Sequence, residues 1–465
     1  MSKINVRLVP RSESSAPLAR FANQPSTGAH LSVNPSTRAF QRARRAVEDR
    51  AIRDEPTPLK RLSLELEESE FHEMFGDVAL HTDAARTAKA PSVTMQESFR
   101  KPQEQLKVPE ALSDSVAFAY VPRPVEFFAP SAIPPHEDIY HLRLSDVSAA
   151  LNAPRCHRNG WTGRGAKVAM ADTGFMLHPH FLRGGYKLIP TQAPGSGPAD
   201  IDASGHGTGE AANIFAIAPD CTVFGVKHGS SSAATLETCI AQGPDVMTNS
   251  WGYDIDHQSR ETLEQTDPNM FLELLDLEAV ITSAVTSGIT VLFSAGNGHL
   301  AFPACHPDVI AVGGVTVNED SSLEASNYAS AFHSQLYPGR NVPDFCGIVG
   351  RSETPPQSAH IMLPVPPDAE LDGENFPSGA SGTGWGIFSG TSAACPQAAG
   401  LVALLKQIAR GLDPAQVGQV LAARAVDIES GQTATGASAA TGPDLATGAG
   451  LVDALRACGF VSGVA

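Results

Sequence analysis

The sequence predicts an α/β fold in which a mostly parallel sheet is flanked by helices and preceded by an N-terminal extension. The chain has 465 residues, whereas a single hydrophobic core stops growing at roughly 250–300 residues. After residue 138, apolar strand-like runs alternate with helical stretches, which is typical of a parallel sheet. Four prolines between residues 124 and 137 indicate a linker between the two parts.

The N-terminal extension divides into two segments. Residues 1–57 are rich in Ser, Pro, Arg and Ala and contain few large apolar side chains, so we expect a flexible tail. Residues 58–138 form a second region. Within it, the alternating Leu62, Leu64 and Leu66 and the apolar run at residues 116–121 predict two strands.

The following region, residues 139–465, contains five apolar runs that predict parallel strands. They span residues 166–171, 221–226, 246–251, 288–294 and 309–312. A helix is predicted over residues 272–286. Sites in such sheets gather at the carboxyl ends of the strands, where Asp172, Ser250 and Asn297 fall.

Composition narrows the class of partner. The net charge of −17, from 50 acidic and 33 basic residues, argues against nucleic acid or an anionic membrane as a partner. The seven cysteines include no C-x-x-C pair, which favours buried reduced thiols. The sequence shows neither a signal-peptide pattern nor an apolar run of about 18 residues. We therefore expect a cytoplasmic protein.

Three glycine-rich phrases contain the candidate catalytic residues. Asp172 lies in Ala-Asp-Thr-Gly, His206 in Gly-His-Gly-Thr and Ser392 in Gly-Thr-Ser. Ser, His and Asp can form a nucleophilic relay, in which His accepts the Ser proton and Asp orients His. Ser392 precedes an apolar helical stretch, so we place it at a helix N-terminus, which suits an oxyanion.

Each phrase has an alternative interpretation. Asp-Thr-Gly also marks aspartic peptidases, which need a second such carboxylate, and the chain supplies one only as a homodimer. The neighbouring His178 and His180 suggest a metal, but no ligand at suitable spacing completes a zinc set. Ser392 taken alone is also typical of a helix N-cap, and Asn297-Gly298 of a plain turn.

From about Leu144 to Ala457 the chain resembles the subtilisin-like serine peptidases, or subtilases. The phrases Asp-Thr-Gly, His-Gly-Thr, Ser-Trp-Gly, Ala-Gly-Asn and Gly-Thr-Ser-x-Ala-x-Pro occur in the family's order. The resemblance implies a subtilisin-like fold and a catalytic triad of Asp172, His206 and Ser392. It also implies an oxyanion hole formed by Asn297 and the Ser392 N–H. The implied substrate-binding residues are Ser250, Trp251, Gly252, Ala295 and Gly296.

The implied activity is serine endopeptidase hydrolysis through an acyl-enzyme, with a protein or peptide as substrate. No cofactor is required. The family often carries structural calcium, but no segment here matches a calcium loop, so no metal ligand is assigned. Two alternatives stay open: a transamidase or macrocyclase of the same fold, and a catalytically inactive peptide-binding module.

The sequence also departs from the family pattern. Gly209 and Gln397 stand where histidines are usual, and Ala393 replaces a common Met. Residues 345–385 are predicted to be an insertion near the site, acting as a lid or exosite. Residues 58–138 resemble a subtilisin propeptide only faintly. They are either a cleaved propeptide or a permanent regulatory region, and residues 1–138 could bind a regulatory partner.

Overall fold

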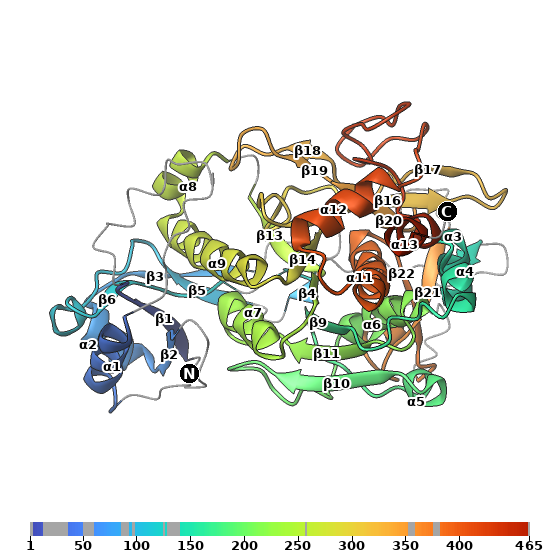
Figure 1. The fold of residues 1–465 in the computed structure, drawn as a ribbon. Helices are drawn as coiled ribbons and strands as arrows, with labels where there is room; N and C mark the ends of the chain where they lie inside the picture. The colour runs from blue at the N-terminus through green and yellow to red at the C-terminus, as the bar shows by residue number, and fades with distance from the viewer. Residues whose placement is uncertain are drawn as a thin grey trace.

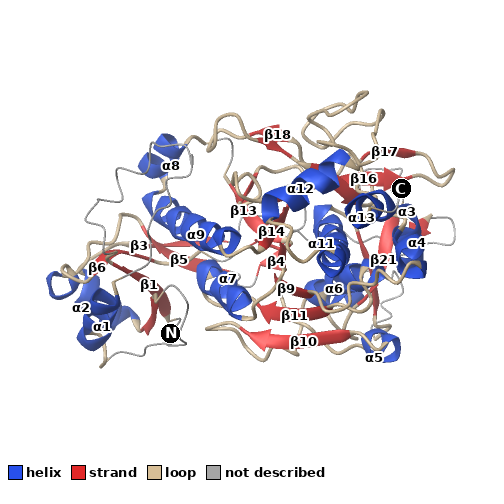
Figure 2. Cartoon of the chain, in the orientation of Figure 1, coloured by secondary structure: helices blue, strands red, loops and turns tan. Residues whose placement is uncertain are grey.

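The computed structural model describes residues 3–12, 36–49, 60–84, 93–94, 98–123, 126–127, 140–255, 258–351, 359–374 and 382–463. In Figure 1 the N-terminal elements, drawn in blue, lie beside a larger α/β unit. The helices of that unit cover both faces of its sheet, as the colouring in Figure 2 makes clear.

The large sheet has eight strands in the order β10-β11-β9-β12-β14-β16-β17, with β20 paired to β16. All its pairs are parallel except β16–β17, which confirms the predicted fold class. The strands are β9 (Lys167–Asp172), β10 (Lys187–Gln192), β11 (Thr222–Lys227), β12 (Val246–Asn249), β14 (Thr290–Ser294), β16 (Ile310–Val317), β17 (Leu323–Ala325) and β20 (Phe345–Ile348).

The central strands are apolar at consecutive positions because both faces of the sheet are buried. In β9, Val168 and Met170 contribute to one hydrophobic cluster, whereas Ala169 and Ala171 contribute to another on the opposite face.

The helices of the α/β unit are α3 (Leu144–Ala150), α4 (Ala153–Arg158), α5 (Pro179–Gly184), α6 (His206–Ile217), α7 (Ser232–Ala241), α8 (Arg260–Thr266), α9 (Pro268–Thr286), α10 (Glu370–Glu374), α11 (Thr391–Ile408), α12 (Pro414–Ala423) and α13 (Ala454–Ser462). The helix predicted over residues 272–286 is part of α9.

Smaller sheets surround the large one. A four-stranded sheet has the order β15-β13-β7-β4, a three-stranded sheet the order β22-β21-β8, and the pairs β18–β19 and β3–β5 form hairpin-like sheets. Their bounds are β3 (Leu80–Ala84), β4 (Val93–Thr94), β5 (Ser98–Pro102), β7 (Glu126–Phe127), β8 (His141–Leu142), β13 (Trp251–Asp254), β15 (Ala301–Phe302), β18 (Phe332–His333), β19 (Asn341–Val342), β21 (His360–Pro364) and β22 (Trp385–Phe388).

The N-terminal unit is an antiparallel sheet of order β2-β1-β6 with its own hydrophobic core. Its elements are β1 (Ile4–Pro10), α1 (Thr37–Ala46), β2 (Leu62–Leu66), α2 (Glu68–Phe75), the 3₁₀ turn η2 (Glu110–Leu112) and β6 (Val116–Tyr120). Both strands predicted between residues 58 and 138 are confirmed. Leu62, Leu64 and Leu66 are buried, as their alternation indicates.

The expectation of a flexible tail over residues 1–57 is wrong for two segments. Residues 4–10 form β1, the central strand of the N-terminal sheet, and residues 37–46 form α1. The basic run at residues 42–45 lies on α1, where Ala43 is buried in the core. Composition concealed β1 because it carries a charge, Arg7, among its apolar residues, and it concealed α1 because that helix is rich in Arg. The remaining residues of 1–57 lie mostly outside the described part of the chain.

The predicted insertion at residues 345–385 also needs correction. Residues 345–348 form β20, which pairs in parallel with β16 of the main sheet and is fully buried. The additional structure begins later: β21 pairs with β22 and with β8 at the periphery. The Pro- and Gly-rich surroundings of β20 concealed a short core strand. The linker predicted over residues 124–137 lies outside the described residues apart from β7.

Buried charges join the N-terminal sheet to α7 and α9. Arg7 of β1 contacts Asp276 of α9 at 3.0 Å and Glu237 of α7 at 2.9 Å, and Arg61 contacts Asp276 at 3.0 Å. The Tyr120 hydroxyl donates to Asp276 at 2.6 Å. Burial opposes ionisation of Asp276, but the charges of Arg61 and Arg7 outweigh it and lower its pKa.

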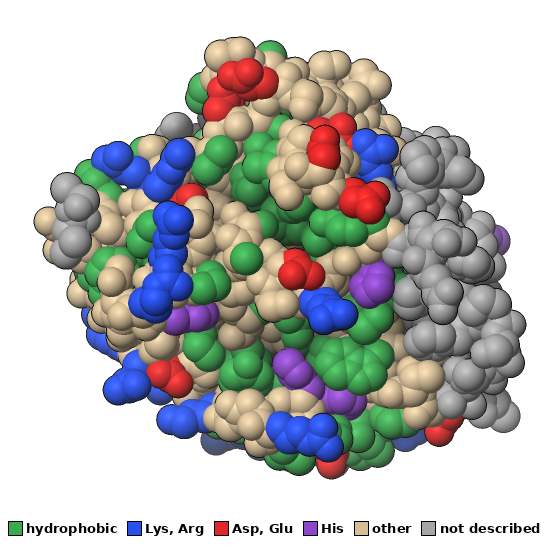
Figure 3. All heavy atoms as spheres, turned by 90° about the vertical axis from the view of Figure 1, so that its right-hand side faces the viewer, with side chains coloured by type: hydrophobic (Ala, Val, Ile, Leu, Met, Phe, Trp, Pro, Cys, Tyr) green, Lys and Arg blue, Asp and Glu red, His purple; other side chains and the backbone are tan. Residues whose placement is uncertain are grey.

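The seven cysteines are free and buried, as expected. No helix in the described part of the chain is long and apolar enough to cross a membrane. Figure 3 shows the face that lies on the right of Figure 1, where acidic, basic and apolar side chains are interspersed. The exposed large apolar side chains of the described residues are Leu177, Leu182, Ile189, Ile201 and Phe460.

Candidate active site

Asp172 and His206 are brought together by β9 and α6. Asp172 is the last residue of β9 and His206 the first residue of α6, and both side chains are fully buried. The His206 Nδ1–H donates to Asp172 Oδ1 at 2.8 Å, while the Thr173 N–H donates to the same oxygen at 2.8 Å. The carboxylate therefore fixes the orientation of the imidazole ring.

The surroundings of His206 favour its charged form. Burial alone would lower the pKa of His206, but the charge and hydrogen bond of Asp172 outweigh burial. With smaller contributions from Glu210 and Asp202, they raise this pKa to about 9. An imidazolium that forms during a reaction is thus stabilised in place.

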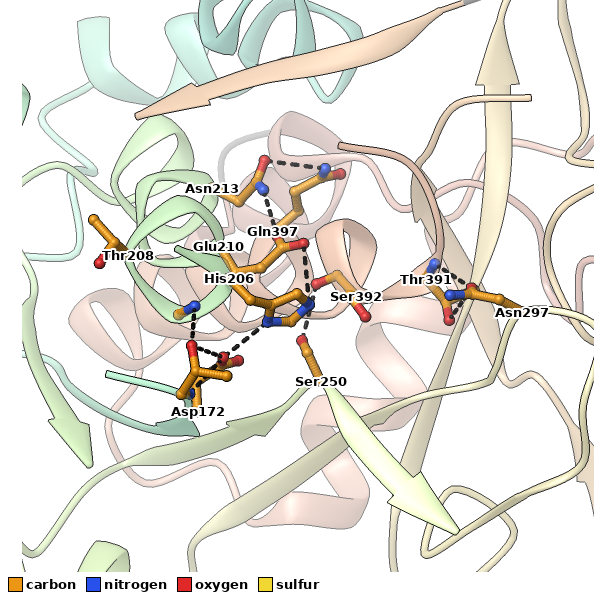
Figure 4. Close-up of polar contacts among 12 residues, drawn as sticks. Asp172, His206, Thr208, Glu210, Asn213, Ser250, Asn297, Thr391, Ser392 and Gln397 are labelled. Carbon is orange, nitrogen blue, oxygen red and sulfur yellow. Dashed lines mark hydrogen bonds and ion pairs between the residues drawn. The ribbon is translucent and has the colours of Figure 1, made fainter. Parts of the chain in front are cut away.

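Ser392 lies in the first turn of α11, as the sequence predicts. In Figure 4 the three side chains lie in one row, with His206 between Asp172 and Ser392. The Ser250 Oγ donates to the Ser392 carbonyl at 2.9 Å, which ties the end of β12 to the start of α11. The first N–H groups of a helix have no intrahelical acceptor and suit a developing oxyanion.

Asn297 follows β14 and contacts the same helix N-terminus. Its Oδ1 accepts from the Thr391 N–H at 2.9 Å and from the Thr391 hydroxyl at 3.0 Å. Because the amide oxygen is held in this way, Nδ2 is oriented away from Thr391, and it has no hydrogen-bond partner among the described residues. Gly390 permits the approach: its φ is +91°, and a Cβ there would lie 2.7 Å from Nδ2.

The predicted substrate strand is β13. Trp251 and Gly252 lie on it, directly after Ser250, while Ala295 and Gly296 follow β14, close to the Thr391 hydroxyl, which accepts from the Gly296 N–H at 3.0 Å. One edge of β13 pairs with β15 and the other with β7, antiparallel. A segment of the chain's own N-terminal region therefore occupies the edge at which substrate was expected to bind.

The family model of peptidase S8, the subtilase family, matches residues 163–450. The chain belongs to the subtilase family. It is 29% identical over 270 residues to M-protease of Shouchella clausii (strain KSM-K16), a match that covers 55% of this chain and 58% of M-protease. It is also 29% identical over 270 residues to Subtilisin Savinase of Lederbergia lenta, covering 55% and 82% respectively.

Solved structures share the fold. Fervidolysin from Fervidobacterium pennivorans, described as a keratinolytic enzyme related to subtilisin, matches with a TM-score of 0.60 and 17% identity, over 98% of this chain and 61% of fervidolysin. A lanthipeptide protease matches with a TM-score of 0.51 and 20% identity, over 68% of this chain and 94% of that protein. The chain spans less than two thirds of M-protease and of fervidolysin.

The structure accounts for two departures of this subtilase from the family pattern. A Cβ at Gly209 would lie 2.4 Å from Cζ of Phe388, so the Phe388 ring fills the space that a side chain would need. The Gln397 amide forms two hydrogen bonds with the backbone of Ile348, the last residue of β20. Its Nε2 donates to the Ile348 carbonyl at 2.9 Å, and its Oε1 accepts from the Ile348 N–H at 2.8 Å.

Asp202 of this subtilase is a site residue that sequence reasoning missed. Its fully buried carboxylate accepts hydrogen bonds from the Thr173 hydroxyl, the Gly205 N–H, and both the N–H and the hydroxyl of Thr208. These bonds join the end of β9 to the start of α6. An Asp four residues before His206 is the local signal that could have identified it.

Sequence reasoning also missed Glu210, one helical turn after His206. Its carboxylate is fully buried, and Oε1 lies 4.0 Å from His206 Nε2. Within the described residues, no group of three or more His, Cys, Asp or Glu is arranged to hold a metal ion.

Proposed function

We propose that the protein is a serine endopeptidase in which Asp172, His206 and Ser392 form the catalytic triad. The observation that carries the proposal is the buried contact of 2.8 Å between His206 Nδ1 and Asp172 Oδ1, next to a serine in the first turn of α11. Membership of the subtilase family supports the same reaction class.

In the proposed reaction, Ser392 Oγ attacks the carbonyl carbon of a peptide bond while its proton moves to His206 Nε2. The negative charge that develops on the carbonyl oxygen is stabilised by Asn297 Nδ2 and the Ser392 N–H. His206 then donates the proton to the leaving amine, which leaves an acyl-enzyme. Water hydrolyses the acyl-enzyme with His206 as general base.

We further propose that residues 58–138 restrain this site. The pairing of Trp251 with Phe127 and of Gly252 with Glu126 is the kind of strand addition by which an extended substrate would bind. The buried contacts of β1 and β6 with α7 and α9 support a docked N-terminal unit that delivers β7 to β13.

A fluorophosphonate probe tests the proposed activity. Incubation of the full chain with the probe, followed by intact mass measurement and peptide mapping, should show one adduct on Ser392. The adduct should be lost in Ser392→Ala and in His206→Ala. If folded protein forms no adduct, even after the N-terminal unit has been displaced by substitution, the chain is an inactive peptide-binding module.

The same mass spectra test the type of restraint. Cleavage between residues 128 and 142 in active samples, absent from Ser392→Ala, identifies residues 58–138 as a cleaved propeptide. A full-length mass that persists in labelled, active protein identifies a permanent regulatory region. Adding an amine acceptor distinguishes a transamidase, because the acyl group would then be recovered as an amide of that acceptor.

A further inference from the structure

A buried polar chain connects Glu210 to the core of the α/β unit. The Asn213 Nδ2 donates to Glu210 Oε2 at 2.9 Å, and the Gln397 Nε2 donates to Asn213 Oδ1 at 3.3 Å. Gln397 is in turn held by two hydrogen bonds to the backbone of Ile348 in β20. Figure 4 shows Glu210, Asn213 and Gln397 as a continuous series that begins at His206.

Only one oxygen of the Glu210 carboxylate, Oε2, accepts a hydrogen bond in this polar series. The other, Oε1, is buried and has no hydrogen-bond partner among the described residues, and it lies 4.0 Å from His206 Nε2. Burying a carboxylate costs several kcal/mol unless it is paired. The nearby imidazole is the group that can supply the pairing charge.

His206 therefore lies between two carboxylates. Asp172 is bonded to Nδ1 and Glu210 lies on the Nε2 side. Among the described residues, the other titratable groups that face these side chains from neighbouring elements are Asp202, in the loop before α6, the thiol of Cys395, on α11, and His228, after β11, whose pKa burial lowers to about 4. None of them is a cation, so the imidazolium of His206 is the charge that balances the carboxylates.

We propose that Glu210 is a positioning residue for His206: held by Asn213 and Gln397, its carboxylate stabilises the imidazolium from the Nε2 side, opposite Asp172. The proposal rests on the proposed function in one respect only, that His206 is the general base. When Ser392 Oγ gives its proton to Nε2, the charged ring forms beside Glu210, and the proton leaves again with the amine. The number of protons is unchanged over one acylation.

This assignment explains one departure from the family pattern. Gln397 replaces a histidine and is the residue that supports Asn213. Ser392, Cys395 and Gln397 all lie on α11, which packs along α6. Asn213 lies seven residues after His206 and Glu210 four residues after it, so all three point to one face of α6. The buried Glu210 thus has an amide partner, Asn213, that is itself held by a second amide, Gln397.

Two pKa values are consistent with this geometry. Burial raises the pKa of Glu210 to about 8, although the charge of His206 acts against the increase, so the carboxylate that stabilises the imidazolium forms as the pH rises through about 8. Glu210 also contributes to the raised pKa of His206, after Asp172. Because the two groups are 4.0 Å apart, their protons are lost in shared steps.

The test is an NMR titration of the full chain with ¹³C at histidine Cε1, assigned through His206→Gln. In Glu210→Gln, which keeps the side-chain shape but removes the charge, the pKa of His206 should fall by about one unit or more. The matched control is Glu261→Gln, the same replacement on an exposed residue of α8, which should leave it unchanged. An unchanged or higher pKa of His206 in Glu210→Gln overturns the proposal. A structural role alone would lower stability without moving this pKa.

A second measurement needs no variant. With ¹³C at glutamate Cδ in the wild-type chain, the Glu210 carboxyl and the His206 ring should titrate with the same apparent midpoints, and independent midpoints overturn the proposal. The pH dependence of fluorophosphonate labelling adds a functional readout, whose midpoint should shift to lower pH in Glu210→Gln. Absence of labelling in every variant refutes the endopeptidase but leaves the NMR result to decide on Glu210.

Discussion

At the scale of single residues, Asn297 depends on Thr391 for its orientation. Both hydrogen bonds to Asn297 Oδ1 come from Thr391, and they leave Nδ2 as the donor for the proposed oxyanion. Sequence reasoning identified Asn297 from its place after a strand, but it could not identify Thr391 as the partner, because 94 positions separate the two residues.

Asn297→Ala should lower kcat by about 10²–10³-fold, the loss known for the oxyanion donor of subtilisin, a family relative. The KM for a peptide substrate should change little, because the interaction strengthens mainly in the transition state. Thr391→Val should also lower kcat, but by less, since Asn297 Oδ1 loses the bond from the hydroxyl and keeps the bond from the backbone N–H of residue 391. Steady-state kinetics on a peptide substrate measure both effects, and a change confined to KM would contradict this role.

The pH dependence of labelling follows from the pKa of His206. In the proposed reaction the free imidazole is the general base, and a pKa raised to about 9 means that the ring is charged at neutral pH. Labelling of Ser392 should therefore be slow at pH 7 and rise through about pH 9. A rate that is independent of pH between 7 and 10 would contradict the prediction.

The stability of the folded chain should change over the same pH range. The folded pKa of His206 exceeds its unfolded value, so the stabilising contribution is fully present below about pH 6.5. It is lost as the pH rises through about 9. Urea unfolding midpoints at pH 6 and pH 9.5, compared with those of His206→Gln, measure this contribution.

At the scale of elements, the packing of α6 against β22 depends on Gly209. A Cβ there would lie 2.4 to 3.0 Å from three atoms of the Phe388 ring. Gly209→Ala should therefore destabilise the protein by about 1–3 kcal/mol. Gly418→Ala in α12 is the matched control, because its Cβ would lie 3.5 Å from Ile310. It should be neutral or stabilise by about 0.5–1 kcal/mol. Equal unfolding midpoints for the two variants would refute the role given to Phe388.

Elements were predictable where burial on both faces produced a continuous apolar run, as in β9 and β14. β1 was not predictable, because Arg7 interrupts its apolar pattern. The carboxylates that compensate the charge of Arg7 lie on α7 and α9, 230 and 269 positions away. The link from Glu210 through Asn213 to Gln397 was hidden for a related reason. A carboxylate in an apolar helix has no evident role until the second helix is placed beside it.

At the scale of the whole molecule, Arg7 holds the N-terminal unit on the α/β unit. Arg7→Met would leave Asp276 and Glu237 buried with less compensation, which costs about 3–5 kcal/mol. We expect the N-terminal unit to dissociate, with faster proteolysis of residues 3–123 and faster labelling of Ser392. Lys3→Met is the control, since Lys3 forms only an exposed contact of 3.9 Å with Glu65. Labelling at the wild-type rate in an Arg7→Met protein whose N-terminal unit is cleaved would refute the restraint.

The pairing of β7 with β13 has a consequence for how the site can be opened. As long as the chain is uncleaved, both strands belong to one polypeptide, so β7 meets β13 at an effective concentration set by the connecting chain and not by the amount of protein. Dilution cannot remove it. Under the proposed restraint, a peptide in solution competes against a tethered strand, so turnover would begin once the tether is cut or the interface at α7 and α9 is released.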